Sequence, residues 1–273
     1  MNFNDITKPL IMGILNVTPD SFSDGGNFTQ IDSALQHVET MLAEGADIID
    51  IGGESTRPGS DPVSPSEQIQ RVLPVIQAIK TKFSNKVIIS IDTTSSTVAD
   101  AALASGANLI NDVSGGENDS AILDLAAKKN VPIILMHSKG APKTMQDNPF
   151  YEDVVNEVIA SLKIKITHAL ETGVKKENIS IDPGIGFGKR KQDNLDLLAN
   201  LWQFVELGYP VLLGTSRKRF MGSICNVTEP SELVTATAVT TALGVMAGVK
   251  IFRVHDVKEN RQALDVAWSI KQR

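Results

Sequence analysis

The stretch VIISIDTTSSTVADAALASGANLIND, residues 87–112, decides the fold. An apolar run of strand length, Val87–Ile91, ends in two polar residues, and the following segment Ser96–Ala104 has helical periodicity. Gly106 marks the end of that helix, because glycine is the preferred residue just past a helix C-terminus. A second apolar run, Asn108–Ile110, follows at once. A strand, a helix and another strand in this order predict two parallel strands joined by a right-handed crossover.

The same unit recurs along the whole sequence. The expected strands are Leu10–Leu15, Asp47–Ile51, Val87–Ile91, Asn108–Ile110, Pro132–Met136, Ile179–Ile181, Val211–Leu213 and Val249–Val254. The expected helices are Ile31–Ala43, Glu67–Phe83, Ser96–Ala104, Ala121–Lys129, Val154–Glu171, Asn194–Leu207, Ser231–Met246 and Glu259–Ile270. Eight such units in 273 residues favour a closed barrel over a doubly wound open sheet. No linker divides the chain, so we expect a single α/β domain over residues 1–273, a (β/α)8 TIM barrel.

Local signals refine these bounds. Ser64, Pro65 and Glu67 combine an N-cap serine, a proline at the first helical position and a capping-box glutamate, which predicts a helix start. Other helices are expected to end at Gly45, Gly106, Gly173, Gly208 and Gly248. The apolar window Leu233–Phe252 contains threonines, glycines and a lysine, so we interpret it as a buried helix followed by a buried strand rather than a membrane span.

Composition narrows the class of function. The formal net charge is −6 and no run of lysine and arginine is longer than three residues, which argues against a nucleic-acid partner. The single cysteine, Cys225, excludes an internal disulfide framework and a multi-cysteine metal site. The N-terminal segment lacks the pattern of a secretion signal, so a cytoplasmic location without a membrane partner is expected.

Polar side chains follow every expected strand. They are Asn16, Gly52–Arg57, Asp92 and Thr93, Asn111 and Asp112, His137, Asp182–Gly184, Gly214–Lys218, and Arg253–Asp256. In β/α barrels the active site is built at the C-terminal ends of the strands. A structural barrel has little reason to repeat this pattern eight times, so the set predicts an active site at one mouth of the barrel.

The residue types suggest the kind of ligand. Arg57, Lys218, Arg253 and His255 are cationic or become so, which suits a multiply charged anion such as a phosphate. The side chains of Asp92, Asn111 and Asp182 suit the hydrogen-bonding edge of a polar heterocycle. The residues therefore predict an enzyme for a phosphorylated heteroaromatic small molecule. The role of His137 stays open.

Common nucleotide and metal motifs do not fit. The segment Gly184–Lys189 resembles a phosphate-binding loop, but Pro183 and Arg190 stand where a P-loop needs glycine and serine or threonine. Gly214-Thr215-Ser216 begins like a nucleophile elbow, but Lys218 replaces the closing glycine. The sequence contains no closely spaced set of metal ligands, so a tightly held zinc ion is not expected. A labile Mg²⁺ that bridges phosphates remains compatible, because that ion needs few protein ligands.

Two long N-terminal blocks carry a specific resemblance. Residues 13–26, GILNVTPDSFSDGG, and residues 50–59, DIGGESTRPG, resemble the two signatures of dihydropteroate synthases, a family of pterin-binding enzymes. Shorter matches follow in the same order, namely Ile91–Thr93, Ile110–Asp112, Met136-His137, Pro142–Gln146, Asp182–Lys189, Ser216–Lys218 and Arg253–Val257. The resemblance covers nearly the whole chain, from residue 10 to the C-terminus.

The resemblance implies a reaction and its cofactor. A transferase of folate biosynthesis would join 6-hydroxymethyl-7,8-dihydropterin pyrophosphate to p-aminobenzoate and release pyrophosphate, with Mg²⁺ as cofactor and sulfonamides as competitive analogues. A dissociative, SN1-like substitution is expected. The partners implied are these small molecules and a second copy of the chain in a homodimer, with the apolar helices Leu233–Met246 and Ala263–Ile270 as the expected interface.

The resemblance also implies the site residues. The pterin ligands would be Asp92, Asn111, Asp182, Lys218 and Arg253, of which Asp92, Lys218 and Arg253 are also the expected catalytic residues. The pyrophosphate ligands would be Asn16, Arg57, Arg253 and His255, with Asn16 also on the metal. The p-aminobenzoate ligands would be Phe22, Thr56, Pro58, Phe187 and Ser216, where Ser216 is expected at a helix N-terminus. Two alternatives stay open, a pterin-binding methyltransferase domain and a catalytically silent pterin-binding scaffold.

Overall fold

Eight short parallel strands form the centre of the molecule. The computed structural model describes residues 3–18, 27–55, 60–140 and 143–273. The strands are β1 (Leu10–Asn16), β2 (Ile48–Gly52), β3 (Ile88–Asp92), β4 (Leu109–Asp112), β5 (Ile133–Met136), β6 (Ile179–Asp182), β7 (Leu212–Leu213) and β8 (Ile251–Val254). Each lies within two residues of the bounds predicted from its apolar run.

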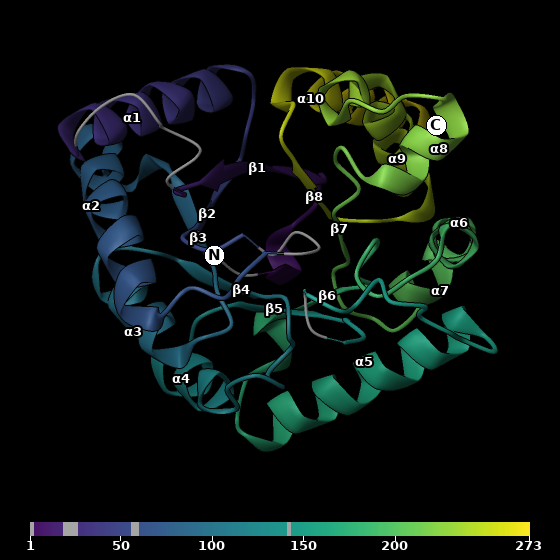
Figure 1. Ribbon diagram of the computed structural model, residues 1–273, viewed down its shortest axis with the longest axis horizontal. Coiled ribbons are helices and arrows are strands. Elements are labelled where there is room, and N and C mark those ends of the chain that lie inside the picture. Colours follow the sequence, from purple (N-terminus) through teal and green to yellow (C-terminus); the bar gives the residue numbers. More distant parts are fainter. Residues whose placement is uncertain (1–2, 19–26, 56–59, 141–142) are drawn as a thin grey trace.

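The strands close into a barrel. Their order is β6-β5-β4-β3-β2-β1-β8-β7, and all neighbours in this order pair in parallel. A single bridge between Ile181 and Val211, with Ile181 N donating to Pro210 O at 3.0 Å, joins β6 to β7 and completes the ring. Seen down its axis, the ring of strands is surrounded by helices (Figure 1). The predicted (β/α)8 barrel is confirmed.

Ten α-helices are found in the described part of the chain. They are α1 (Asn27–Ala43), α2 (Pro65–Phe83), α3 (Ser96–Ala104), α4 (Ala121–Lys129), α5 (Val154–Glu171), α6 (Lys191–Ala199), α7 (Leu201–Val205), α8 (Arg219–Cys225), α9 (Val234–Ala247) and α10 (Val257–Lys271). The helix predicted over Asn194–Leu207 is two helices, because Asn200 leaves helical geometry and its Nδ2 donates to Asp196 O at 2.8 Å. No bounds were predicted for the short helix α8, although Ser216 was expected at a helix N-terminus.

The predicted helix ends are confirmed. Ser64 caps α2, since its Oγ accepts from Glu67 N at 3.3 Å, and Pro65 is the first helical residue. The carboxylate of Glu67 pairs with Arg71 one turn later. All five glycines expected at helix ends have positive φ, from 77° at Gly208 to 115° at Gly106.

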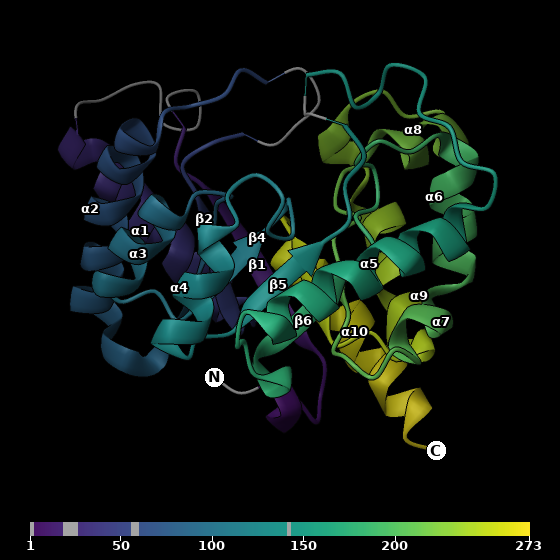
Figure 2. The same ribbon diagram turned by 90° about the horizontal axis from the view of Figure 1, so that it is seen from below.

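Two apolar clusters hold the barrel together. The larger one packs the outer faces of the strands against the helices. The smaller one lies inside the barrel and contains Phe3, Met12, Ile48, Leu109, Ile134, Leu212 and Ile251. Phe3 is 1% exposed, so the N-terminal segment closes one end of the barrel interior. The C-terminus lies toward that end and α8 lies at the other (Figure 2).

The window Leu233–Phe252 forms α9 followed by β8, as predicted, but α9 is only partly buried. Val239 is 54% exposed and Leu243 is 60% exposed, because these positions face away from the barrel. None of the described helices has the length and apolar character needed to cross a membrane. The cytoplasmic location stays a prediction.

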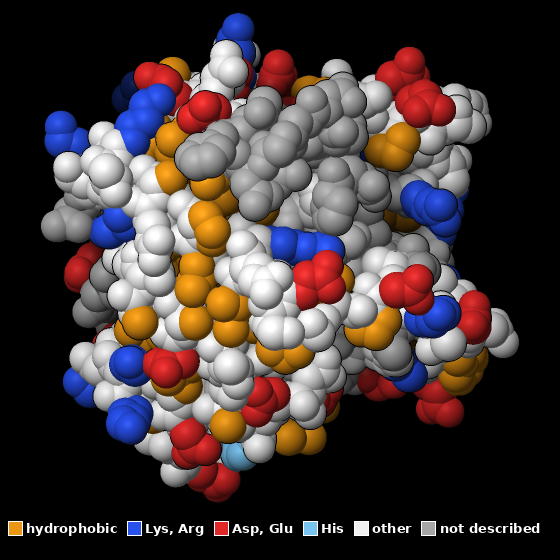
Figure 3. Space-filling view, turned by 60° about the vertical axis from the view of Figure 1, so that its left-hand side comes forward, with side chains coloured by type: hydrophobic (Ala, Val, Ile, Leu, Met, Phe, Trp, Pro, Cys, Tyr) orange, Lys and Arg blue, Asp and Glu red, His pale blue; other side chains and the backbone are white. Residues whose placement is uncertain are grey.

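The described surface carries charges of both signs. On the face seen in Figure 3, acidic and basic side chains are intermixed, and apolar side chains are visible between them. This distribution agrees with the moderate net charge of −6.

Candidate functional site

The inner face of the barrel changes from apolar to polar along its axis. Alternate residues of a strand face the same side. Ile48, Leu109 and Ile251 belong to the apolar cluster inside the barrel. The residues two positions further along these strands are Asp50, Asn111 and Arg253, and they therefore also face inward. The polar layer lies toward the C-terminal ends of the strands, where the sequence predicted the site.

Strand register aligns four of these ends in one row. Asn16 of β1 is opposite Gly52 of β2, Gly52 is opposite Asp92 of β3, and Asp92 is opposite Asn111 of β4. Neighbouring strands lie about 4.8 Å apart. Gly52 therefore provides a gap without a side chain between Asn16 and Asp92, both of which the sequence assigned to the site.

Arg253 links three further strands to β8. Its Nε donates to Asp50 Oδ2 and its Nη2 donates to Asp92 Oδ2, each at 2.6 Å. Asp50 Oδ2 also accepts from Asn111 Nδ2 at 3.0 Å. Sequence reasoning assigned no role to Asp50. The feature that could have pointed to Asp50 is a carboxylate at an inward-facing position of an otherwise apolar strand.

This cluster contains buried oxygens ready to accept hydrogen bonds. Asp50 Oδ1, Asp92 Oδ1 and Ser90 Oγ are buried and have no hydrogen-bond partner among the described residues. Such atoms are costly to bury unless a ligand or water completes them. Burial raises the pKa of Asp92 to about 7, although Arg253 lowers it and Asp50 raises it further. The cluster suits a ligand rich in N–H groups or carrying positive charge.

Asp182 and Lys218 form the second part of the site. Asp182 ends β6 and is 6% exposed, and its Oδ1 accepts from Gly184 N at 2.7 Å. Lys218 Nζ donates to Ile185 O and lies 4.6 Å from the centroid of the Phe187 ring. Burial raises the pKa of Asp182, and burial lowers the pKa of Lys218 to about 8 while Asp182 raises it. A carboxylate and an ammonium thus share one buried region of the mouth.

Two hydrogen-bonded pairs join the loop after β7 to the end of β8. Ser216 Oγ lies 2.9 Å from His255 Nδ1 and accepts from His255 N at 3.1 Å. Arg217 donates to both oxygens of Asp256, at 3.0 and 2.5 Å. The role of Arg217, open from the sequence, is therefore to pair with Asp256. Ser216 precedes α8 by three residues and is not its N-cap, which is Lys218.

Four predicted ligands fall outside the described residues. Phe22 lies within residues 19–26, and Thr56, Arg57 and Pro58 lie within residues 56–59. The described flank of the second segment is anchored, because Glu54 Oε1 accepts from Val63 N at 2.8 Å and Glu54 Oε2 accepts from Gln68 Nε2 at 3.2 Å.

The same hydrogen-bond chain extends from Gln68 to the end of β3. Buried Gln68 accepts at its Oε1 from Thr93 Oγ1 at 3.1 Å, and Thr93 directly follows Asp92. Sequence reasoning missed Gln68, which resembles any polar residue on an amphipathic helix. Through it, the loop after β2 is tied to the strand that carries Asp92.

Comparison with known proteins identifies the family. The model of the pterin binding enzyme family matches residues 12–255. A dihydropteroate synthase of Clostridium beijerinckii is 48% identical, over 99% of this chain and 97% of the relative. The dihydropteroate synthase of Bacillus subtilis is 47% identical, over 92% of this chain and 85% of the relative.

The chain belongs to the dihydropteroate synthase family.

Solved structures agree. The crystal structure of the Clostridium difficile synthase in the presence of pteroic acid has a TM-score of 0.91 and 43% identity, and each chain is covered to 98%. The Xanthomonas albilineans synthase with 4-aminobenzoic acid has a TM-score of 0.90 and 42% identity, over 97% of this chain and 94% of that one. The Yersinia pestis synthase with a sulfonamide drug complex has a TM-score of 0.92 and 40% identity, over 98% and 96%. The family and transferase class expected from the motifs are confirmed.

The donor set fits a metal ion held mainly by substrate. Within the described ranges, no group of three His, Cys, Asp or Glu side chains could hold a metal ion. Asn16 offers one neutral amide oxygen at the half-buried end of β1. Mg²⁺ keeps several waters and binds through few protein ligands plus phosphate oxygens. The residues therefore fit a Mg²⁺ ion that arrives with a phosphate group.

The raised pKa of Asp92 predicts a pH-dependent stability cost. Because the folded pKa of about 7 exceeds the ordinary 3.8, the folded protein binds the proton more tightly than the unfolded chain between these values. The free energy of unfolding therefore falls as the pH rises through this window. Between pH 5 and pH 8, wild type should lose about 1–3 kcal/mol relative to Asp92→Asn.

Urea unfolding of both proteins at pH 5 and pH 8 measures this difference. Subtracting the variant removes the contributions of all other titrating groups that the substitution leaves unchanged. A difference between the two proteins that stays constant across this pH range would show that Asp92 is ionised at its ordinary pKa.

Proposed function

We propose that this enzyme condenses 6-hydroxymethyl-7,8-dihydropterin pyrophosphate with p-aminobenzoate to give 7,8-dihydropteroate and pyrophosphate at the barrel mouth. One observation carries the proposal: Arg253 lies between buried Asp50 and Asp92, whose remaining oxygens have no partner among the described residues. Such a cluster suits a ring with several N–H groups. Relatives were solved with pteroic acid and with 4-aminobenzoic acid.

The pterin ring would be held from both sides of the mouth. Asp182 Oδ1 is already bonded to Gly184 N, so Oδ2 would accept from the ring N–H and 2-amino groups. Asn111 donates its Nδ2 to Asp50, so its Oδ1 would serve as an acceptor. Lys218 would donate to the ring carbonyl, and Arg253 would stack on the ring.

The pyrophosphate would lie beside β1 and β8. His255 and the remaining nitrogen of Arg253 would donate to it, and Arg57 would add a third cation. Asn16 would hold Mg²⁺ through its amide oxygen. When bound, Mg²⁺ supplies charge neutralisation for the leaving pyrophosphate. Phe187, Ser216, Phe22, Thr56 and Pro58 would line the p-aminobenzoate site, where sulfonamides would compete.

The charges favour a dissociative order of events. The C–O bond would break first, and pyrophosphate would leave with the electron pair. Positive charge on the methylene carbon would spread into the dihydropterin ring, near the carboxylate of Asp92. The arylamine nitrogen would then form the new N–C bond and lose its proton. Fixed charges aimed at a developing cation are often the largest source of catalysis.

A turnover assay tests the reaction. Dihydropteroate and pyrophosphate should form in equal amounts from the two substrates, and only when Mg²⁺ is present. Asp182→Ala and Lys218→Ala should lower kcat/KM by at least about 100-fold, because each removes a charged hydrogen-bond partner of the pterin. Folding of the variants is checked by circular dichroism.

Failure of the wild-type assay would still be informative. Methyl transfer from a methyl-folate to a cobalamin acceptor would indicate the methyltransferase alternative. Pterin binding without any turnover would indicate the scaffold alternative.

The order of bond breaking is tested with ring-substituted anilines. If C–O cleavage precedes N–C bond formation, kcat at saturating arylamine should change less than about threefold across a series of arylamines whose pKa values span several units. A rate that rises steeply with the basicity of the amine would contradict a dissociative path.

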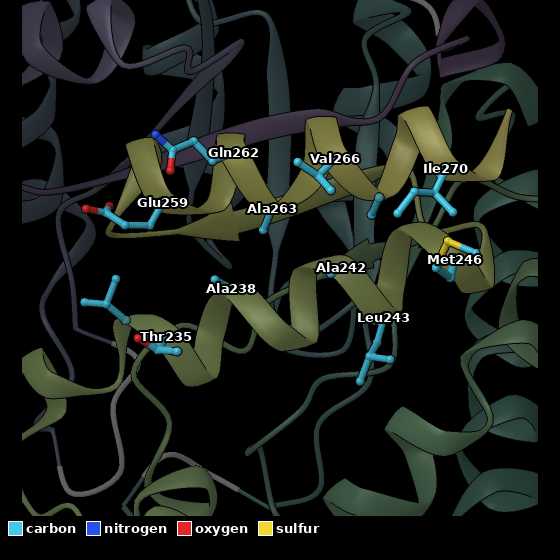
Figure 4. Close-up of a pocket in the computed structure, with 12 residues that line it drawn as sticks. Thr235, Ala238, Ala242, Leu243, Met246, Glu259, Gln262, Ala263, Val266 and Ile270 are labelled. Carbon is cyan, nitrogen blue, oxygen red and sulfur yellow. The ribbon is translucent and has the colours of Figure 1, made fainter.

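We further propose that a second copy of this chain covers the groove between α9 and α10. The groove has a volume of about 550 Å³ and is lined mainly by apolar side chains of both helices (Figure 4). Small residues, Ala238, Ala242 and Ala263, line it beside protruding Leu243 and Val266, which are 60% and 62% exposed. In a two-fold symmetric contact the same surface of each copy meets its counterpart, so that surface must contain both recesses and protruding side chains.

Sedimentation at micromolar concentration should therefore show a dimer. Val266→Lys should shift it to monomer, because the contact would bury an unpaired charge. The matched variant Ile164→Lys, at a 71% exposed apolar position on α5, should remain dimeric. A monomeric wild type, or a dimeric Val266→Lys, would contradict the proposal.

A further inference from the structure

Lys189 is a buried cation that the proposed reaction does not use. Its side chain is 3% exposed, and its Nζ donates to Gly184 O at 2.8 Å and to Phe187 O at 3.0 Å. The same Nζ lies 3.0 Å from His137 Nδ1. These three contacts match the three protons of an ammonium group. The charge is therefore fully hydrogen bonded inside the protein.

The segment that Lys189 contacts has little regular backbone hydrogen bonding. Gly184, Gly186 and Gly188 have φ of 68°, 81° and 62°, so the chain between Asp182 and Lys189 follows neither helix nor strand. One backbone bond, from Phe187 N to Gly184 O at 3.1 Å, closes a turn, and the carbonyl oxygens otherwise accept from side chains. The donors are Lys189 for Gly184 and Phe187, Lys218 for Ile185, Gln146 for Gly186 and Tyr151 for Gly188. Five consecutive carbonyls thus accept from side-chain donors, and Lys189 supplies two of these five bonds.

The segment packs directly on the loop after β5. A Cβ atom on Gly184 would lie 1.8 Å from His137 O, and His137 N donates to Asp182 O at 3.0 Å. The ammonium of Lys189 lies between the two loops, since it contacts His137 on one side and the glycine-rich segment on the other. Lys189 therefore fixes the segment against a neighbouring strand end rather than only within itself.

The neutral form of His137 fits this arrangement. Burial lowers the pKa of His137 far below its usual range, and the charge of Lys189 lowers it further. A neutral imidazole can accept at Nδ1, as the contact with Lys189 requires. Burial lowers the pKa of Lys189 to about 7, while the carboxylate of Asp182 raises it. The charges of Lys189 and Asp182 attract each other across the segment and partly offset the effect of burial, which favours the neutral form of both groups.

We propose that Lys189 is a positioning residue for both substrates, which holds residues 182–188 so that the Asp182 carboxylate and the Phe187 ring face the mouth in a fixed arrangement. The inference rests on the proposed function, because it assigns the pterin to Asp182 and p-aminobenzoate to Phe187. Lys189 itself touches neither substrate and acts through Gly184, Phe187 and His137.

The test is Lys189→Met, which keeps the length of the side chain and removes all three donors. Calorimetry with 6-hydroxymethyl-7,8-dihydropterin pyrophosphate should show a Kd at least about tenfold higher than that of wild type. KM for p-aminobenzoate should rise as well, while kcat at saturation changes less than about threefold, because ground-state binding is what is lost.

Lys165→Met is the matched control. Lys165 is as deeply buried, at 4% exposed, and its Nζ donates to Ser114 O at 2.5 Å in the loop after β4, with Glu117 at 3.0 Å. Its side chain has the same length as that of Lys189, and it also donates to a backbone carbonyl, in another loop. Its loss should leave the Kd for the pterin and the KM for p-aminobenzoate within about twofold of wild type.

Each outcome of these experiments supports or overturns the proposal. An unchanged pterin Kd in folded Lys189→Met, or an equal rise in Lys165→Met, overturns the proposal. Lys189→Gln keeps an amide that can donate to two of the three acceptors, so its Kd should be intermediate. If both Lys189 variants fail to fold while Lys165→Met folds, Lys189 supports the fold and the proposal is wrong. Since Kd needs no turnover, absent catalysis in wild type would refute the proposed reaction separately.

Discussion

The barrel mouth depends on one buried cation placed between two buried carboxylates. Moving Asp50 and Asp92 out of water costs several kcal/mol each, and their pairing with Arg253 offsets this cost because the bonds are short and charge-assisted. One guanidinium cannot neutralise two carboxylates. Burial is the main reason that the pKa of Asp92 is raised to about 7, and the negative charge of Asp50 raises it further. The folded protein therefore contains a site prepared for positive charge before any ligand enters.

Parallel strands make this arrangement precise. Residues of β2, β3, β4 and β8 meet at Arg253 although they are up to 203 positions apart in the chain. Their backbones are fixed by strand register, so the side chains have little freedom to separate. The loops then link the mouth sideways, Ser216 to His255 and Gln68 to Thr93. Strands position the inward-facing polar groups, and side-chain bonds between loops position the rest of the mouth.

The sequence predicted the strands and their polar ends well, because apolar runs and terminal polar residues are local signals. Asp92, Asn111 and Asp182 were found for this reason. Asp50 was missed because it interrupts an apolar run, and only the inward register gives it a meaning. Lys189 was noted only as the end of the Gly184–Lys189 segment, and no role was predicted for it. Its three acceptors come from loop geometry, which no periodicity encodes. The break at Asn200 likewise depends on a side chain that competes with the backbone.

The hydrogen bonds already present limit how a pyrophosphate can be held. Arg253 uses Nε and Nη2 for carboxylates, Arg217 uses its fork for Asp256, and Lys189 uses all three protons. Among the described residues, these cations have little capacity left for a multiply charged group. The pyrophosphate grip would then rest on His255, on one remaining nitrogen of Arg253, on Arg57 and on a metal ion at Asn16. A leaving group held at the rim would depart with the bonding electron pair most easily when the ring that it leaves is bound over negative charge and can become positive. The same charge distribution that makes Asp92 costly to bury thus favours cleavage before attack.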